Sequence, residues 1–258
     1  MVSHINADEG HEALLNNTLT IYNQCFPGDT MYGSYAGARE RVVEGNIAMG
    51  EGLGISLFSS VKRDEIFSKE KSPINWHDYK INGSRDALYK ELHDAMNANS
   101  SNYDKLLFIG GIINLVEDLS LPIHDNIESA KVDTKRIFEK LMYDNVLCND
   151  IDMNEQSVEE IRIESANKIA SYLKQDIPSC PDVKWQEFWK DNKDKESPNF
   201  GQAGLFRLKE GPTCKFEDND KRYKDFVYSL HLNAIDADFK LLNWSTKNIL
   251  KRDKKLKF

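Results

Sequence analysis

Several features that would have identified a class of protein are missing from this 258-residue sequence. No segment is apolar for long enough to span a bilayer, and residues 1–20 lack the basic start and apolar core of a signal peptide. The four cysteines are scattered without any CxxC spacing; they are Cys25, Cys148, Cys180 and Cys214. In a chain without an export signal this pattern predicts reduced structural thiols. We therefore expect a cytoplasmic protein without a membrane anchor.

An excess of basic charge is missing too. The chain has 34 Lys and Arg residues against 42 Asp and Glu, a formal net charge of -8, which argues against broad affinity for duplex nucleic acid or anionic membranes. Glycine-rich phosphate loops, nucleophile elbows and Cys–His pairs at diagnostic spacing are absent, so reactions that depend on them have no support here. The composition, 40% hydrophobic and 29% charged, is that of a soluble globular protein.

Helical spacing dominates the sequence, whereas strand signals are almost absent. The first helix carries a stripe that includes His11, Leu14, Leu15, Thr18 and Tyr22, and a second helix follows the N-cap candidate Ser84 as far as Met96. All seven prolines fall between the expected helices, as in all-α proteins. Further helices are predicted over about 36–50, 56–67, 102–119, 127–143, 155–174, 183–191 and 221–250.

The chain is interpreted as one all-α multi-helix domain over residues 1–258. Residues 192–220 are rich in Asn, Asp, Lys, Gly and Pro, and we interpret them as a surface excursion rather than a linker. The last helix then presents an apolar stripe that should dock on the core, with a dimer seam as the alternative; its members are Tyr223, Val227, Leu230, Ala234, Ala237 and Leu241.

The segment most suggestive of chemistry runs from Gly110 to His124. Its helix is apolar almost all round, yet it carries Asn114 and Asp118 one turn apart, and a buried carboxylate needs a partner. Pro122 ends the helix, so that His124 can fold back toward Asp118. A metal ion would satisfy these groups, although a capped Asp and an ordinary loop His are the simpler explanation of this pair alone.

More potential ligands lie upstream. His11 shares its stripe with apolar residues, so its ring should point toward the core, where many histidines are merely hydrogen-bonded. Asp64 and His77 are separated by a short polar segment that Pro73 interrupts, so a helix-end carboxylate and a loop imidazole can converge. Neither observation alone predicts a metal site.

Together these residues resemble the superfamily of zinc-dependent phospholipase C and the fungal single-strand nucleases. Its central motif is His, three residues, Asp, three residues, Pro, one residue, His, and this chain has Asn114, Asp118, Pro122 and His124 at those positions. His11 resembles the first histidine of the family, and Asp64 with His77 resembles its next Asp–His pair. The resemblance covers about the first half of the chain. It implies an all-α phosphoesterase in which His11, Asp64, His77, Asn114, Asp118 and His124 bind metal.

The chain departs from the family at three points. Asn114 replaces a histidine, the N-terminal tryptophan ligand is missing with only His4 as a substitute, and the later His–Glu pair has no counterpart. We therefore expect one or two divalent ions rather than three, with magnesium or manganese favoured over zinc by the oxygen ligands. Lys135 or Arg136 is a candidate for the charge of the third ion, although a solvated helix face is the simpler reading.

The resemblance implies that Asp118 bridges two ions, that Asp64 and His77 hold one, that His11 helps to hold the other, and that Asp64 and Asp118 are catalytic. We expect a phosphoesterase that releases phosphate from nucleoside or deoxynucleoside monophosphates, without stable binding to duplex nucleic acid. A nuclease or phospholipase C is the alternative within this class. A non-catalytic binding protein with a degraded metal site is the alternative outside it, favoured by Asn114 and the missing ligands. The sequence leaves the oligomeric state open.

Overall fold

The computed structural model describes residues 5–27, 32, 37–50, 90, 92–94, 96–97, 101–119, 156–185, 205–207, 213–215 and 220–250. For a few of these, Asp118 among them, only the backbone is described. The helices predicted over 56–67 and 127–143 lie outside the described residues.

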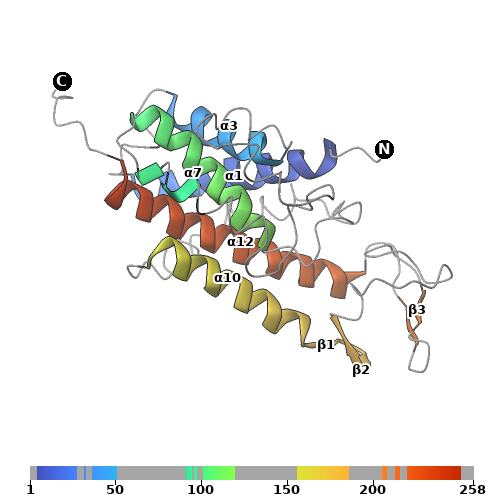
Figure 1. Cartoon of the computed structure of the whole chain (residues 1–258). Helices are drawn as coiled ribbons and strands as arrows, with labels where there is room; N and C mark the ends of the chain where they lie inside the picture. The colour runs from blue at the N-terminus through green and yellow to red at the C-terminus, as the bar shows by residue number, and fades with distance from the viewer. Residues whose placement is uncertain are drawn as a thin grey trace, which may run out of the picture.

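Five long helices make up most of the described structure (Figure 1). The prediction of a mostly helical chain is confirmed, and four of the predicted ranges agree with helices to within a few residues. The helices are α1 (Ile5–Cys25), α3 (Ala38–Gly50), α7 (Asn102–Leu119), α10 (Val158–Leu173) and α12 (Lys221–Asn248). None of the described helices is both long and apolar enough to cross a membrane.

Side-chain caps fix where the last two helices begin. The Ser157 hydroxyl accepts a hydrogen bond from the backbone N–H of Glu160, whose carboxylate accepts one from the Ser157 N–H at 2.7 Å, completing a capping box before α10. Asp220 caps α12 by accepting from the N–H of Arg222 at 2.9 Å. Both caps satisfy N–H groups that the first helical turn leaves without partners.

Two short antiparallel hairpins accompany the helices. β1 (Asp176–Ile177) pairs with β2 (Cys180–Lys184), and β3 (Leu205–Arg207) pairs with β4 (Thr213–Lys215). The helix predicted from residue 183 is therefore wrong at its start, because Val183 and Lys184 belong to β2. Tertiary contacts explain the difference: Val183 is fully buried, and the ring of Trp185 stacks on Phe226 of α12 at 4.2 Å between centroids.

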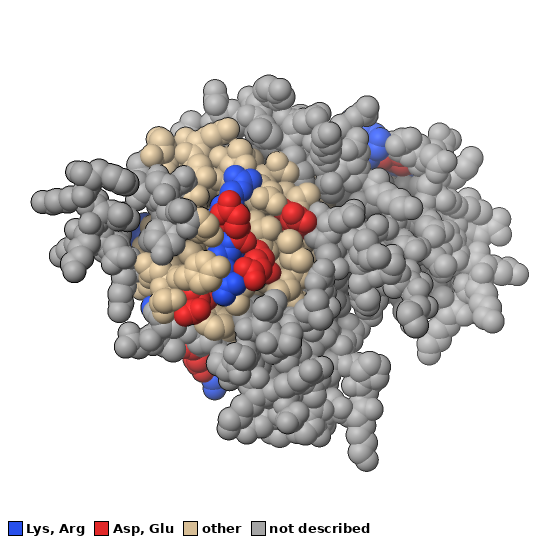
Figure 2. Space-filling view, turned by 90° about the horizontal axis from the view of Figure 1, so that it is seen from above, with Lys and Arg blue, Asp and Glu red and all other residues tan. Residues whose placement is uncertain are grey.

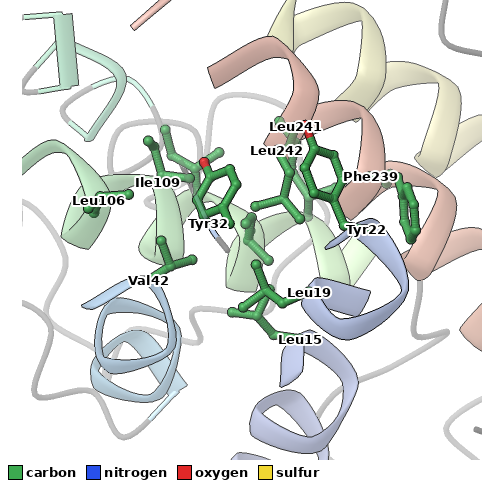
Figure 3. Packing of buried hydrophobic residues seen from close by; sticks show 14 of the residues in the cluster. Leu15, Leu19, Tyr22, Tyr32, Val42, Leu106, Ile109, Phe239, Leu241 and Leu242 are labelled. Atoms are coloured by element: carbon green, nitrogen blue, oxygen red, sulfur yellow. The ribbon is translucent and has the colours of Figure 1, made fainter. Parts of the chain in front are cut away.

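The main apolar core lies where α1, α3, α7 and α12 meet (Figure 3). Leu15, Leu19 and Tyr22 of α1 face Leu242 and its neighbours on α12 and the inner side of α7. On α12 the predicted core stripe is confirmed at Leu230, Ala234, Ala237 and Leu241, all of which are buried. The other two members of that stripe have no described side chain. α10 packs along the opposite side of α12 (Figure 1).

Ion pairs join α10 to α12. Lys240 of α12 lies within 3.0 Å of Glu164 and 3.2 Å of Asp236, and Lys168 of α10 lies 2.9 Å from both carboxylates. Burial alone would raise the pKa of Glu164, but hydrogen bonds from Gln156 and the two lysines outweigh it and lower that pKa to about 2. The network fixes the register of the two helices.

Two glycines let α3 and α7 cross with their backbones in contact. A Cβ atom on Gly110 would lie 1.9 Å from the carbonyl oxygen of Val42, and one on Gly45 would lie 2.0 Å from that of Leu107. No other residue type fits at such a crossing. The close approach brings Asn46, next to Gly45, against the end of α7.

Cys25 and Cys180 are both disulfide-bonded, and the described part of the chain contains no free cysteine. The prediction of reduced thiols is therefore wrong for these two residues. Cysteines that are far apart in a sequence can be neighbours in the fold, so their scatter carried no information about pairing.

Candidate functional site

His11 lies inside the helical core, as its stripe predicts. The side chain is 5% exposed, and its Nδ1 atom lies 2.7 Å from Oε2 of Glu117, 106 residues later in the chain. Glu117 is on the last turn of α7, directly before Asp118. The fold therefore brings the first predicted ligand to the helix end that carries the central motif.

Glu117 is the centre of a buried polar cluster. The residue is 1% exposed, and the same Oε2 atom accepts a second hydrogen bond from Nδ2 of Asn46 at 2.8 Å. Its partners come from α1 and α3, so one carboxylate connects three helices. Charge-assisted hydrogen bonds of this kind are short and stronger than neutral ones, which compensates for the burial of the charge.

Asp238 of α12 extends the cluster. It is fully buried, and its neighbours are the Glu117 carboxylate and the Thr18 hydroxyl. Burial first, and then the charge of Glu117, raises the pKa of Asp238 well above its ordinary value. The raised pKa favours the protonated form of Asp238, which can share its proton with Glu117, as in other pairs of adjacent buried carboxyl groups.

His231 of α12 is the second buried histidine, with 7% of its surface exposed. Burial, followed by the positive charge of His11, lowers the pKa of His231 to about 4. The imidazole is thus neutral at neutral pH. The structure places His231 in the electrostatic neighbourhood of His11.

The structure describes only part of the predicted ligand set. Asn114 is 2% exposed, one turn before Glu117, and its Nδ2 atom has no hydrogen-bond partner within the described residues. Asp118 follows Glu117 at the end of α7, with only its backbone described. The other predicted ligands, together with the candidates for auxiliary roles, lie outside the described residues; they are Asp64, His77 and His124, and His4, Lys135 and Arg136.

Sequence reasoning missed four members of the buried cluster: Asn46, Glu117, His231 and Asp238. A signal existed for two of them. Glu117 is a carboxylate on a helix that is apolar almost all round, and Asp238 follows Ala237 of the core stripe. Nothing in the local sequence indicated that the two side chains meet.

The described donors around His11 form no complete metal site. Among the residues that the structure describes, no three or more His, Cys, Asp or Glu side chains are arranged to hold an ion. His11 nevertheless has a carboxylate on Nδ1, the arrangement typical of histidines that bind metal through the other ring nitrogen. The unpartnered atom of the buried Asn114 amide is Nδ2, a hydrogen-bond donor, so it gives no support to a metal. The His11–Glu117 contact is compatible with a metal ligand at His11.

Two described surface pockets lie apart from the cluster. One, of about 520 Å³ between α1 and α3, is lined by three glutamates and one arginine, so its charged groups are mostly acidic; they are Glu12, Glu40, Glu44 and Arg39. The other, of about 220 Å³ between α10 and α12, has Lys247 and Trp244 in its wall. Neither includes a member of the buried cluster.

No family model matches the chain, and comparisons with curated proteins and with solved structures also find no similar protein.

Proposed function

We propose that the protein is a metal-dependent phosphoester hydrolase that releases phosphate from nucleoside or deoxynucleoside monophosphates. The observation that carries the proposal is the contact between His11 and Glu117. It joins the first residue of the suggested ligand set to Glu117, which directly precedes Asp118, the central residue of the motif, in the sequence. Two histidines and two carboxyl groups buried around this point are costly to retain without a role.

Some of the proposed ligands lie in the described part of the chain and others lie outside it. His11 and Asp118, with the amide oxygen of Asn114, would hold metal from the described part of the chain. Asp64, His77 and His124 are proposed to complete the set, with Asp64 and Asp118 as the catalytic carboxylates. One or two divalent ions, magnesium, manganese or zinc, would lower the pKa of attacking water and neutralise charge on the phosphate oxygens.

A small monoester suits the charge of this protein better than a polymer. The net charge is -8, and among the coloured residues of Figure 2 acidic and basic side chains lie next to one another. Arg41 and Glu44, for example, are paired at 2.7 Å. A nucleic-acid strand needs a row of cations along its backbone, whereas one phosphate group needs a single charged point.

Two alternatives remain in view. A nuclease or phospholipase C would use the same metal chemistry on a diester. A non-catalytic binding protein is favoured by the amide at position 114 and by the absence of a complete ligand group among the described residues. The buried His11–Glu117 contact weighs against the second alternative, because buried polar groups are costly to retain without a role.

We predicted a cytoplasmic location partly because we expected reduced thiols, and that expectation does not hold at Cys25 and Cys180. Disulfides persist mainly in oxidising compartments, so the bonds at Cys25 and Cys180 favour such a compartment over the cytoplasm. The substrates of the proposed enzyme would then be nucleotides outside the cytoplasm.

The test is phosphate release after chelation and readdition of magnesium, manganese or zinc. The substrates are a panel of nucleoside and deoxynucleoside monophosphates, beside a diester and single-stranded DNA. We expect metal-restored release from monophosphates. Cleavage of the diester alone would replace this function by that of a nuclease, and inactivity with all three metals would favour the binding protein.

A further inference from the structure

Cys180 lies where the β1–β2 hairpin meets the start of α12. It is the first residue of β2, its side chain is buried, and it belongs to an apolar cluster that includes Phe226 of α12. Arg222, in the first turn of α12, donates from Nη1 to the carbonyl oxygen of Pro178 at 3.1 Å and to Sγ of Cys180 at 3.4 Å. Because Cys180 is disulfide-bonded, a second cysteine must reach this place. The chain has three others, Cys25, Cys148 and Cys214.

Cys25 lies too far from Cys180 to be its partner. It is the last residue of α1, and the ring of Tyr22, one turn earlier, lies 5.6 Å from that of Phe239 in α12. With a rise of about 1.5 Å per residue, Phe239 lies about 25 Å along α12 from Arg222, which contacts Cys180. The Cα atoms of a disulfide are usually less than about 7 Å apart. In Figure 1, α1 accordingly begins, and does not end, on the side of the β1–β2 hairpin.

The length of α10 separates Cys148 from Cys180. This helix runs opposite to α12: Gln156, just before its start, lines a pocket with Trp244 near the end of α12, whereas its other end leads into β1. The 16 residues of α10 span about 24 Å. The stretch 148–156 reaches at most about 29 Å when fully extended. A bond between Cys148 and Cys180 would need almost all of that length laid out along α10, so Cys148 is a poor partner.

Cys214 belongs to a strand that contacts β2. It is the middle residue of β4 and pairs with Phe206 of β3. Cα atoms of β2 and β4 lie within 8 Å of one another. Because β4 has only three residues, the backbone of Cys214 either makes that contact or lies directly next to it. Of the three cysteines, Cys214 is therefore the one whose backbone lies at a separation compatible with a bond to β2.

We infer that Cys180 forms a disulfide with Cys214, which fastens the β3–β4 hairpin to β2 and, through Arg222, to the start of α12. The bond anchors the segment 192–220, which the sequence analysis interprets as a surface excursion. Its formation joins the two sulfur atoms and removes two protons and two electrons, which a disulfide in an oxidising compartment accepts as it becomes two thiols. Cys25, which is also disulfide-bonded, is then left with Cys148. The inference is independent of the proposed function.

The experiment is peptide mapping of the unreduced full-length protein by mass spectrometry. Thiols are first blocked with N-ethylmaleimide at acidic pH, which prevents exchange of the disulfides. Trypsin should then release each cysteine in a peptide of its own, over residues 1–39, 141–162, 175–184 and 210–215. We expect peptide 175–184 to be joined to 210–215 and peptide 1–39 to be joined to 141–162, and reduction should separate both pairs.

Two variants give a second readout. In denatured Cys214→Ser, one thiol per chain should react with N-ethylmaleimide, and it should be that of Cys180. Cys148→Ser is the matched control, in which the reactive thiol should be that of Cys25 while Cys180 stays bonded. If Cys214→Ser does not fold, the map of the wild type decides.

Several results would overturn the inference. One is peptide 175–184 joined to 1–39 or to 141–162, and another is the same peptide recovered from the wild type with a blocked thiol. A dimer of the chain that only reduction separates, with peptide 175–184 in the linkage, would overturn it too. Cys214→Ser with Cys180 still bonded to a cysteine of the same chain would have the same meaning.

Discussion

Replacing Gly110 by alanine should destabilise the protein by an amount that follows from the α3–α7 crossing. The added Cβ would lie 1.9 Å from the Val42 carbonyl oxygen and 2.9 Å from the Asn46 amide nitrogen, whereas ordinary contacts begin at 3.4 Å. Both obstacles are backbone atoms, which cannot move aside by changing rotamer. The two helices would have to separate by more than 1 Å, which would also pull Asn46 away from Glu117.

The sign of the change in the free energy of unfolding distinguishes an obstructed position from an unobstructed one. A glycine-to-alanine change in an unobstructed helix stabilises by up to about 1 kcal/mol. Overpacking of a core typically costs about 1–3 kcal/mol and occasionally more, and the rigid obstacle here places Gly110→Ala at the upper end, at about 3 kcal/mol. For a chain of this length such a loss lowers Tm by several degrees.

Urea denaturation followed by far-UV circular dichroism measures the change. Gly45→Ala should behave like Gly110→Ala, because its Cβ would meet the Leu107 carbonyl at 2.0 Å. Ile163→Ala, at a side chain 49% exposed, is the control and should stay within about 0.5 kcal/mol of the wild type. A Gly110→Ala protein as stable as the wild type, or more stable, would refute the close crossing of α3 and α7.

Three further predictions concern the buried cluster and the disulfides. His231 has a folded pKa of about 4, below its unfolded value of 6.5, so it favours folding above pH 6.5. In metal-free protein about 3 kcal/mol should be lost between pH 6.5 and 4, and His231→Gln should lose that much less in urea titrations at the two pH values. Equal losses would contradict the buried neutral ring. Asp238 has a raised folded pKa, so its contribution should be lost as the pH rises through that value. Asp238→Asn should then show a flatter stability profile on the alkaline side, and an unchanged profile would place the proton elsewhere. Reduction of the disulfides at Cys25 and Cys180 should lower the free energy of unfolding by about 2–4 kcal/mol per bond, and urea midpoints that are identical with and without reductant would count against them.

Much of the helical structure could be predicted because its signals are local. The range 102–119 follows from an apolar segment of helical spacing and coincides with α7. The start of α10 is encoded in Ser157 and Glu160, three residues apart. The hairpins were missed because strands of two to five residues carry little periodicity, and β2 is stabilised by contacts of Val183 and Trp185 with distant elements.

The inward orientation of His11 could be predicted from the sequence, but its partner could not. The motif pointed to the end of α7, and the stripe on α1 pointed His11 inward, which together located the contact region. The carboxylate that His11 meets is nevertheless Glu117, the neighbour of Asp118. Which of two adjacent carboxylates faces another helix depends on how the helices rotate and cross, here through Gly45 and Gly110, and no local pattern contains that information.

The central claim is that metal binding and phosphate release depend on the end of α7. The most direct measurement compares the wild type with Asp118→Asn in Mn²⁺ titration calorimetry and in phosphate release from nucleoside monophosphates, with far-UV circular dichroism as the check on folding. The account predicts that Asp118→Asn keeps its helical spectrum while metal binding and hydrolysis are both lost. A folded Asp118→Asn protein that binds the ion and releases phosphate like the wild type would contradict it.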